Sequence, residues 1–490
     1  MKLGQITPAT IQAGLQHTAK KRAIARDRLG RYGCNENDVP IFSRRYEIGG
    51  VEQTDLICRK INYDLFSEVV DMKTGYMYGV PVKVSINKER FVKEKAVMAG
   101  RNVLQKIMTK ITEAIAKPDV AQEIADSEYQ LQRFGTINDI DKQNSEIGTY
   151  NAVAGYAGRL HYIGRDKEIH CSTIPPQQCS FFDDASIYTF KVLELENGTT
   201  VEKEKGIAYD DVNQYEFDGW VNVKITKTEP HGFTENPFIK AINNINERGD
   251  CDNAIAMIDQ FDRTLSDWCS ENEQFRLAIL AAIGVDVDKG FFEDVKKYGG
   301  AKIPTGGDMK YITKILPYEQ VLALLKELRE GVLYTTKTPD LRPDSNVGTQ
   351  TGVALDIKMR PFEFKCGDAE RHMTSFMRNS YRIIAEAMKK WGLGTIEYSA
   401  IDFTFTRNYP HNMLEEAQIQ SLLDGKIPDI DRLKLFSAIK DPEQALERLK
   451  DQKEDSLNYT FPATDTSADT GTDPNAPETP EKPVIEDKTA

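Results

Sequence analysis

The chain has 490 residues, of which 40% are hydrophobic and 28% charged, and its formal net charge is −13. This composition is typical of a folded protein, and the length suggests about three structural units. The longest apolar run, near 277–287, is far shorter than the ~20 residues that a membrane span needs. The first residues lack the apolar core of a signal peptide, so we expect a protein made and used in the cytoplasm, or in something assembled there. The acidic balance argues against a protein that simply coats nucleic acid.

Motifs for catalysis and for metal binding are missing from the sequence. It has no P-loop, no HExxH and no Gly-x-Ser-x-Gly motif, and none of its six histidines has the spacing of a metal ligand. The seven cysteines form no CxxC pair, so we expect reduced and mostly buried thiols. We therefore predict no enzyme, no cofactor, no catalytic residue and no metal site. A nuclease with dispersed carboxylates would escape this reasoning.

The first 60 residues are helical in character and locally basic. A solvated helix face is the favoured interpretation of this basic stretch, ahead of a docking or DNA-contact surface. The cations are Lys20, Lys21, Arg22, Arg26, Arg28 and Arg31. Residues 88–147, rich in Lys, Glu, Ala and Gln, also predict helix.

Strands are expected from about Gly155 onwards. Alternating sequences flank Asn197-Gly198 and Asp218-Gly219, and such dipeptides are the strongest short signals for a hairpin. Two hairpins placed among helices imply an antiparallel sheet and therefore an α+β fold.

After Pro237 the sequence predicts helices again. Two of them carry apolar stripes at helical spacing, and the second follows Pro317. The stripes consist of Ile258, Phe261, Leu265 and Trp268, and of Val321, Leu324, Leu325, Leu328 and Val332. The segment 284–316 between them is rich in Gly and Lys, with turn signals at its glycine pairs.

A long polar segment with prolines and glycine covers 337–351, and such loops are often functional or disordered. Pro361 should break or kink a helix that begins at Gly352. A helix of about 25 residues should follow at 367–391, and then a strand at 396–405.

The last folded part is predicted to be a helical module. Its helices should cover 414–423 and 430–439, and Asp441-Pro442 is a good start for a third. From about Thr460 the chain has almost nothing to bury, so we expect disorder there.

Several short segments between Asn62 and Asp455 form an ordered set of motifs. They lie at 74–82, 158–162, 174–184, 236–244, 258–267, 338–340, 351–355, 415–428 and 441–447. Together they resemble the portal proteins of tailed phages, of the type found in long-tailed phages of Gram-positive hosts. The departures are mild: Phe261-Asp262 stands where that family more often has Tyr-Asn, and Thr351 and Pro428 stand where it often has Ser.

The resemblance implies a mainly helical portal fold of the α+β class, assembled as a ring. The implied parts are the N-terminal part of the wing at 1–250, a stem helix at 251–277, the clip at 278–316, a second stem helix at 317–335, the tunnel loop at 336–352, a kinked helix with the C-terminal part of the wing at 353–411, the crown at 412–459, and a disordered acidic tail at 460–490.

By the same resemblance, twelve subunits form a ring at one capsid vertex. Double-stranded DNA passes through its channel during packaging, retention and ejection, without sequence recognition. The implied partners are the terminase large subunit, the head-completion adaptor, and the major capsid and scaffold proteins, with no membrane involved. The protein would be part of the virion, assembled in the host cytoplasm.

In such a ring the tunnel loop would bring Arg342 against the phosphate backbone, with neighbouring carboxylates limiting the attraction. The alternative for Arg342 is a helix cap or an ordinary ion pair with Asp344. The predicted channel residues are Asp340, Arg342, Asp344, Ser345, Asn346, Gly348, Thr349 and Gln350.

Two further surfaces are predicted in the ring. The clip lysines would face the terminase or the adaptor, with solvated surface as the alternative for each: Lys289, Lys296, Lys297, Lys302 and Lys310. The stem stripes would pack neighbouring subunits through Ile258, Phe261, Leu265, Trp268, Val321, Leu325 and Leu328.

Two other classes of protein share this composition and lack of motifs. One is a virion structural or scaffold-like protein without a channel, which should not form closed rings. The other is a metal-dependent DNA-processing enzyme, which should cleave DNA.

Overall fold

The computed structural model divides the chain into two compact units, Met1–Asn408 and Tyr409–Ala490, which are described separately. The structure describes residues 1–45, 47–48, 51–52, 57–98, 117–196, 199–275, 279–283, 306–312, 318–342, 352–408, 413–436, 439 and 442–458.

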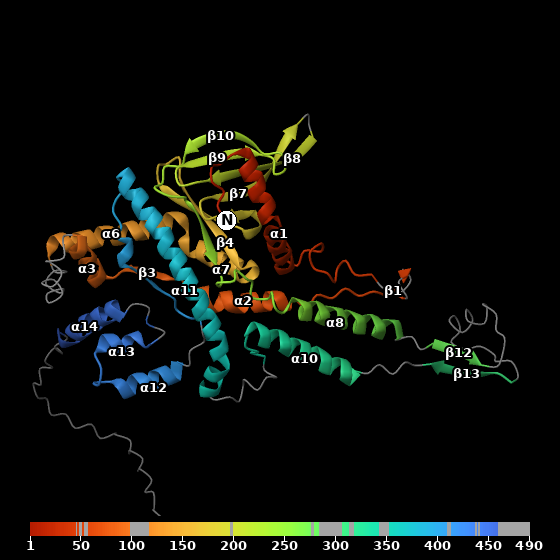
Figure 1. Cartoon of the computed structure of the whole chain (residues 1–490). Coiled ribbons are helices and arrows are strands. Elements are labelled where there is room, and N and C mark those ends of the chain that lie inside the picture. The colour runs from red at the N-terminus through yellow and green to blue at the C-terminus, as the bar shows by residue number, and fades with distance from the viewer. Residues whose placement is uncertain are drawn as a thin grey trace, which may run out of the picture. The chain divides into compact units, whose positions relative to one another are not determined.

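The first unit combines long helices with antiparallel sheets (Figure 1). Its α-helices are α1 (Pro8–Tyr32), α2 (Leu65–Tyr78), α3 (Lys88–Met98), α6 (Pro118–Asn138), α7 (Ile140–Ala154), α8 (Ile255–Phe275), α10 (Tyr318–Thr336) and α11 (Gly352–Trp391). Short 3-10 helices cover Pro176–Gln178 and Tyr398–Ala400. The start of α1 shows why these boundaries arise: Thr7 and Thr10 form a capping box, and Pro8 stands at the first helical position.

The strands of the first unit pair antiparallel throughout the part of the chain that the structure describes. One sheet has the order β10-β9-β8-β7-β6, a second has β11-β4-β5, and three pairs are β14-β3, β12-β13 and β1-β2. The bounds are β1 (Glu47–Ile48), β2 (Val51–Glu52), β3 (Lys83–Ile86), β4 (Tyr156–Ile163), β5 (Ile169–Ile174), β6 (Cys179–Phe181), β7 (Ser186–Glu196), β8 (Thr199–Tyr209), β9 (Asn213–Asp218), β10 (Lys224–Pro230), β11 (Phe238–Ile242), β12 (Ile279–Ile283), β13 (Asp308–Ile312) and β14 (Ile401–Thr404).

Both predicted hairpins are present. Glu196 pairs with Thr199, so β7 and β8 are joined by the two residues Asn197-Gly198, as the sequence predicted. The second hairpin pairs Asp218 with Lys224, so its connection, 219–223, is longer than the predicted Asp-Gly turn. Gly219 has a φ of 76°, a conformation that suits glycine. The α+β expectation is therefore confirmed.

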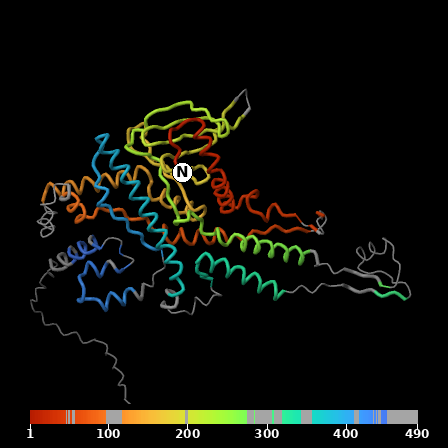
Figure 2. The backbone as a smooth tube through the Cα atoms, in the orientation of Figure 1, coloured from red at the N-terminus to blue at the C-terminus, as the bar shows by residue number. Residues whose placement is uncertain are grey.

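Two predicted helical regions are wrong in detail. The chain does not become helical directly after Pro237, because β11 (Phe238–Ile242) pairs with β4 and forms the edge of a three-stranded sheet. Pro361 does not end a helix either, since α11 runs unbroken for 40 residues with Pro361 inside it. Figure 2 shows α11 as one continuous coil.

The core of the first unit consists of three clusters of buried side chains. In the first cluster α11 packs on β11 and β4 through Met373, Met377 and Ile384, which are almost fully buried. The second cluster joins α2, α7, α8 and α10. The third lies between α1 and the five-stranded sheet. The side of the molecule that carries α8 and α10 is thus anchored on the same core as the sheets.

The second unit is helical in its described residues, with α12 (Met413–Leu423), α13 (Asp429–Lys434) and α14 (Pro442–Asn458). The three predicted helices are confirmed, although α13 ends before the predicted 439. Gly425, with a φ of 70°, lies in the turn after α12. Asp441 and the predicted tail at 460–490 lie outside the described residues.

The cysteines and the hydropathy of the helices agree with the sequence analysis where the structure describes them. All seven cysteines are free thiols, and Cys171, Cys179, Cys251 and Cys366 are buried. Among the described helices, none is both long enough and apolar enough to cross a membrane.

Candidate functional site

The helices α8 and α10 lie side by side (Figure 1). They lie within or close to the ranges 251–277 and 317–335 that the resemblance implies for two stem helices. Their facing side chains join the cluster that contains Leu65 and Val69 of α2. Ile258, Phe261 and Leu325 are only 4, 5 and 8% exposed within one chain.

Their own chain thus covers these three residues, and the packing of the stem stripes against neighbouring subunits stays a prediction. Leu265, Val321 and Leu328 are partly buried in the same cluster. The Trp268 ring packs on Tyr318, with 5.8 Å between the ring centroids. On the remaining surface of α10, Leu322, Leu324 and Tyr334 are exposed.

An extended segment before α2 lies along the outer side of α8. Backbone N–H groups of alternate residues donate to α8 side chains: Arg59 to Ser270 at 2.8 Å, Ile61 to Ser266 at 2.9 Å, and Tyr63 to Asp262 at 2.9 Å. Four residues of helix rise about 6 Å, and two residues of extended chain span about 6.6 Å, so the two repeats match. We call this set of contacts the α8 ladder.

Asp262 is the charged member of the α8 ladder and is 3% exposed. Burial raises its pKa to about 6, against the opposing effect of the Tyr63 N–H, and the nearby Asp259 and Asp64 raise it further. The sequence offered no signal for this contact, because Asp262 looked like one more polar position on an amphipathic helix.

The first residues of the predicted tunnel loop are hydrogen-bonded to the last turn of α10. Lys337 has a φ of 56°, and the N–H groups of Lys337 and Thr338 bond to the carbonyls of Tyr334 and Leu333 at 3.1 and 2.8 Å. These two hydrogen bonds form the pattern of a Schellman cap, with Lys337 in the position that usually holds glycine. The Thr338 side chain is buried and accepts a hydrogen bond from Thr336.

A network of charged groups follows in the described part of this segment. Arg329 of α10 makes a bidentate pair with Glu68 of α2 at 2.6 and 2.5 Å, and it lies 3.7 Å from Asp340. Arg342 donates to the same Asp340 at 3.1 and 2.9 Å. The Arg342 guanidinium, with Arg329 behind it, lowers the pKa of Asp340. Arg342 thus has an ion pair with Asp340, whereas Asp344, the partner named in the predicted alternative, lies outside the described residues.

A cluster of buried charges lies beside this network. The ammonium of Lys73 on α2 is 3.1 Å from the Asp250 carboxylate and donates to Asn243 at 2.7 Å. Lys365 of α11 lies 3.2 Å from the same carboxylate. Burial opposes the ionisation of Asp250, but the two ammonium groups outweigh it and lower its pKa. Burial also lowers the pKa of Lys73.

Sequence reasoning missed this buried cluster, because its members lie far apart along the chain. The one available signal was the position of Lys73, which falls at helical spacing from Val69 and Met77, on the face of α2 that is buried. An interior lysine usually has a carboxylate partner.

Most of the other predicted site residues lie outside the described residues. These are Asp344, Ser345, Asn346, Gly348, Thr349 and Gln350 of the loop, and Lys289, Lys296, Lys297 and Lys302 of the clip. Lys310 lies on β13 opposite Ala281 of β12, so the two ends of the Gly/Lys-rich insertion form a short antiparallel pair.

Most of the described ion pairs of the basic stretch of α1 are with carboxylates of the same chain. Lys21 pairs with Glu247, Arg28 with Asp252 at 2.9 Å, and Arg31 with Asp259 at 2.6 Å. These carboxylates belong to the beginning of α8 and to the segment before it. Lys20 and Arg26 remain exposed, as expected for a solvated face.

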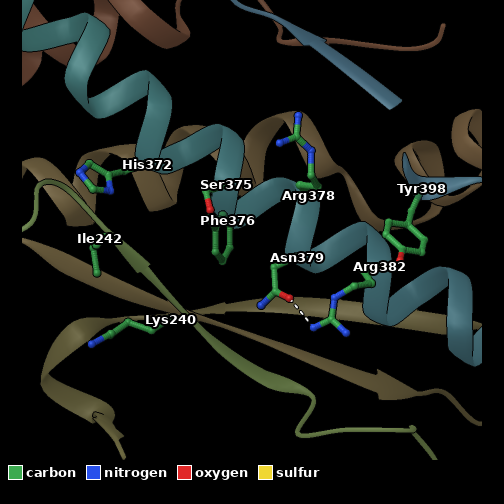
Figure 3. A pocket seen from close by; sticks show the side chains of 9 residues that line it. All are labelled: Lys240, Ile242, His372, Ser375, Phe376, Arg378, Asn379, Arg382 and Tyr398. Carbon is green, nitrogen blue, oxygen red and sulfur yellow. Dashed lines mark hydrogen bonds between the residues drawn. The ribbon is translucent and has the colours of Figure 1, made fainter. Parts of the chain in front are cut away.

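An open pocket of about 450 Å³ lies between α11 and β11 (Figure 3). Its lining residues are Lys240, Ile242, His372, Ser375, Phe376, Arg378, Asn379, Arg382 and Tyr398. Lys240 pairs with Glu247 at 2.5 Å, and Arg382 pairs with Glu235 at 2.7 Å, so carboxylates of the same chain already neutralise these two cations. Ser375 and His372 share no hydrogen bond among the contacts of the described residues.

Histidines and carboxylates form no evident reactive centre in the described part of the chain. No group of three or more His, Cys, Asp or Glu side chains is placed there to hold a metal ion. His161 is buried, with Nδ1 bonded to the Pro237 carbonyl and Nε2 to Ser380, and burial lowers its pKa to about 3. It is a neutral core residue.

Portal proteins of Clostridium phage phiCD119 and Bacillus phage SPP1 are 29% and 22% identical to this protein, over 44% and 40% of this chain. These matches cover 49% and 40% of the relatives, so the chain spans about half or less of their length. A structure of the neck of a native GTA particle, computed with C12 symmetry, is 12% identical with a TM-score of 0.29, over 59% of this chain and 78% of that one.

The family comparison covers far more of the chain. The model described as "Phage portal protein, SPP1 Gp6-like" matches residues 37–459, which include the α8 ladder, the buried charge cluster and the helices of the second unit. The chain therefore belongs to the SPP1 Gp6-like family of phage portal proteins.

Proposed function

We propose that this chain is the subunit of a ring, expected to contain twelve copies, that forms a DNA channel at one vertex of a phage capsid. The observation that carries the proposal is the pair α8 and α10. Both helices pack on the core that contains α2, α7 and β4, and the segment after α10 is hydrogen-bonded to the end of that helix. Membership of the portal family supports it. The ring would serve DNA packaging, retention and ejection, and would have no catalytic activity of its own.

Exposed apolar side chains of α10 support the ring. Leu322, Leu324 and Tyr334 are 53, 47 and 88% exposed in the single chain. Leu322 and Leu324 lie about 200° apart around the helix, so they flank the buried stripe of α10 on its two sides. Exposed apolar side chains on a helix favour burial against other surfaces. We assign Leu322 and Leu324 to contacts with the neighbouring subunits on the two sides of α10, since the inner residues Ile258, Phe261 and Leu325 are covered by their own chain.

The charges of the same helix suit a channel through which DNA slides. Glu319, Glu327 and Glu330 are exposed on α10, with Lys326 as their cationic neighbour. A wall with few cations binds phosphates weakly, since affinity for DNA grows with the number of phosphate contacts. Arg342, which is 45% exposed and held by Asp340, would touch the backbone briefly without reading the sequence.

The remaining partners follow from the family. We propose that the clip region around β12 and β13 docks the terminase large subunit and then the head-completion adaptor, and that other surfaces meet the major capsid and scaffold proteins. The protein would be assembled in the host cytoplasm and would remain in the virion.

Electron microscopy of the purified full-length chain tests this function. We expect closed rings with a central hole and radial wings in top view. Monomers or open filaments at micromolar concentration would favour a virion structural protein without a channel. Cleavage of DNA on addition of Mg²⁺ or Mn²⁺ would favour the DNA-processing enzyme.

A further inference from the structure

We infer that Lys365 is a positioning residue, which fixes the two ends of the loop segment between α10 and α11 relative to the wing. The inference rests on the proposed function, because it describes how the portal loop is held. Its evidence is the single ammonium group of Lys365 on α11, which contacts two other parts of the fold at once.

The contacts of Lys365 join elements that are distant in sequence. Its Nζ donates to the carbonyl of Thr336, the last residue of α10, at 2.9 Å, and lies 3.2 Å from the buried carboxylate of Asp250. Asp250 in turn stands five residues before the start of α8 and bonds through its N–H to Ala152 of α7 at 2.7 Å. One side chain of α11 thus connects the wing-side ends of both α8 and α10.

A second lysine of α11 repeats the contact with the segment after α10. Lys358 donates to the carbonyl of Asp340 at 2.8 Å. The two lysines are seven residues apart, about 10 Å along a helix, and the two carbonyls are four residues apart, at most about 14 Å of chain. The earlier lysine binds the later carbonyl, so α11 and the segment 336–340 run antiparallel. We call this pair of contacts the loop clamp.

Lys365 is not required to neutralise Asp250. Lys73 alone contacts both carboxylate oxygens, at 3.2 and 3.1 Å, so the pair remains balanced when Lys365 loses its charge. Lys365 in fact adds a second cation to the buried site and is one cause of the lowered pKa of Lys73. The contact that depends on Lys365 alone is the one to Thr336.

Pro361 lies midway between the two clamp lysines. It has no N–H, so the Ile357 carbonyl lacks its usual helical partner and α11 is weakened at this point. Phe362 and Cys366, beyond the proline, are buried, and the Phe362 ring packs on Tyr76 of α2 at 5.2 Å. The contact of Lys365 with Thr336 therefore lies on the C-terminal side of Pro361, and the contact of Lys358 with Asp340 lies on its N-terminal side.

Hydrogen–deuterium exchange of the full-length assembled protein tests the inference. In Lys365→Met we expect the amides of 336–342 and 357–364 to exchange at least fivefold faster, while α2 and β4 keep their protection. Lys365→Arg should restore slow exchange, because it retains a donor for Thr336. Lys73→Met is the matched control, since it alters the same cluster and leaves the Thr336 contact intact.

Two results would overturn the inference. One is unchanged exchange at 336–342 in Lys365→Met. The other is an equal loss of protection in α2 and β4, which a merely structural lysine would produce. If Lys365→Met does not fold, Lys358→Met tests the clamp without touching the buried cluster and should speed exchange at 337–342 only. The portal function is tested separately, because ring formation by the unaltered chain does not depend on these exchange rates.

Discussion

Ser266 of α8 accepts a hydrogen bond of 2.9 Å from the backbone N–H of Ile61, more than 200 residues earlier in the chain. The same contact occurs one helical turn away on either side, at Asp262 and Ser270. The side chains of the α8 ladder thus accept the backbone hydrogen bonds that a neighbouring strand would accept in a sheet. They pair N–H groups of an extended segment that runs beside a helix.

Removal of a ladder hydroxyl should destabilise the chain. Ser266→Ala and Ser270→Ala each leave a partly buried N–H without an acceptor, at a cost of about 1–2 kcal/mol in the free energy of unfolding. Both serines are buried, at 0 and 2% exposure. Denaturant unfolding measures the effect, with the exposed Gln260→Ala as the control on the same helix. Losses no larger than that of Gln260→Ala would show that the ladder contributes nothing.

Asp262 should make stability depend on pH. Its pKa is raised to about 6 in the folded chain, so folding disfavours its charged form. The penalty is absent below the ordinary pKa near 4, grows as the pH rises towards 6, and is constant above. Asp262→Asn, which keeps an acceptor oxygen for Tyr63, should therefore be more stable than the unaltered chain at pH 7, by about 1–3 kcal/mol.

Thermal unfolding from pH 4 to pH 8 checks this expectation. The advantage of Asp262→Asn should shrink as the pH falls towards 4, and Asp262→Ala, which loses the acceptor as well, should be less stable than Asp262→Asn. A constant difference between Asp262→Asn and the unaltered chain over this range would contradict the raised pKa.

Arg342 should matter for DNA and not for folding. It is half-exposed, and its ion pair with Asp340 is worth less than about 1 kcal/mol, as for exposed pairs in general. We expect phages with Arg342→Ala to assemble normal rings and to package or retain less DNA per capsid. Arg371→Ala, at an exposed site on α11, is the control. Packaging at normal rate and density in Arg342→Ala would remove the proposed role.

The exposed leucines of α10 should control assembly. Leu322→Asp and Leu324→Asp place a charge where we expect a neighbouring subunit, so the fraction of protein in closed rings should fall at least tenfold, since a buried unpaired charge costs several kcal/mol. The fold should survive, because both side chains are exposed in the single chain. Leu193→Asp, on the exposed part of β7, should leave the rings intact. Electron microscopy and sedimentation measure the outcome, and equal ring fractions in all three variants would refute the assignment.

Local patterns of sequence predicted much of the fold. The stripes of Ile258, Phe261 and Leu265 and of Val321, Leu325 and Leu328 correctly placed α8 and α10, because a helix must bury one face. Asn197-Gly198 correctly located a hairpin, since few dipeptides adopt the required turn. The helices of the second unit were also recognised from their turns and caps.

The errors came from segments whose structure depends on distant partners. Phe238–Ile242 is short and apolar, and such a segment suits a strand or a helix equally until its partner β4, some 80 residues earlier, is in place. Pro361 weakens α11 locally, but packing of Phe362 and Met359 on either side of it keeps the helix continuous.

The sequence by itself determined the class of fold, the order of the helices and hairpins, and the resemblance to portal proteins, because these depend on periodicity, turn chemistry and short motifs. Only the tertiary structure decided that Ile258 and Phe261 face their own chain, that Arg342 meets Asp340, and that Lys73, Asp250 and Lys365 share one buried site. Burial and the shared buried site join residues more than a hundred positions apart, and Arg342 had two nearby carboxylates to choose from, so these are properties of the packed molecule and leave no periodic trace in the chain.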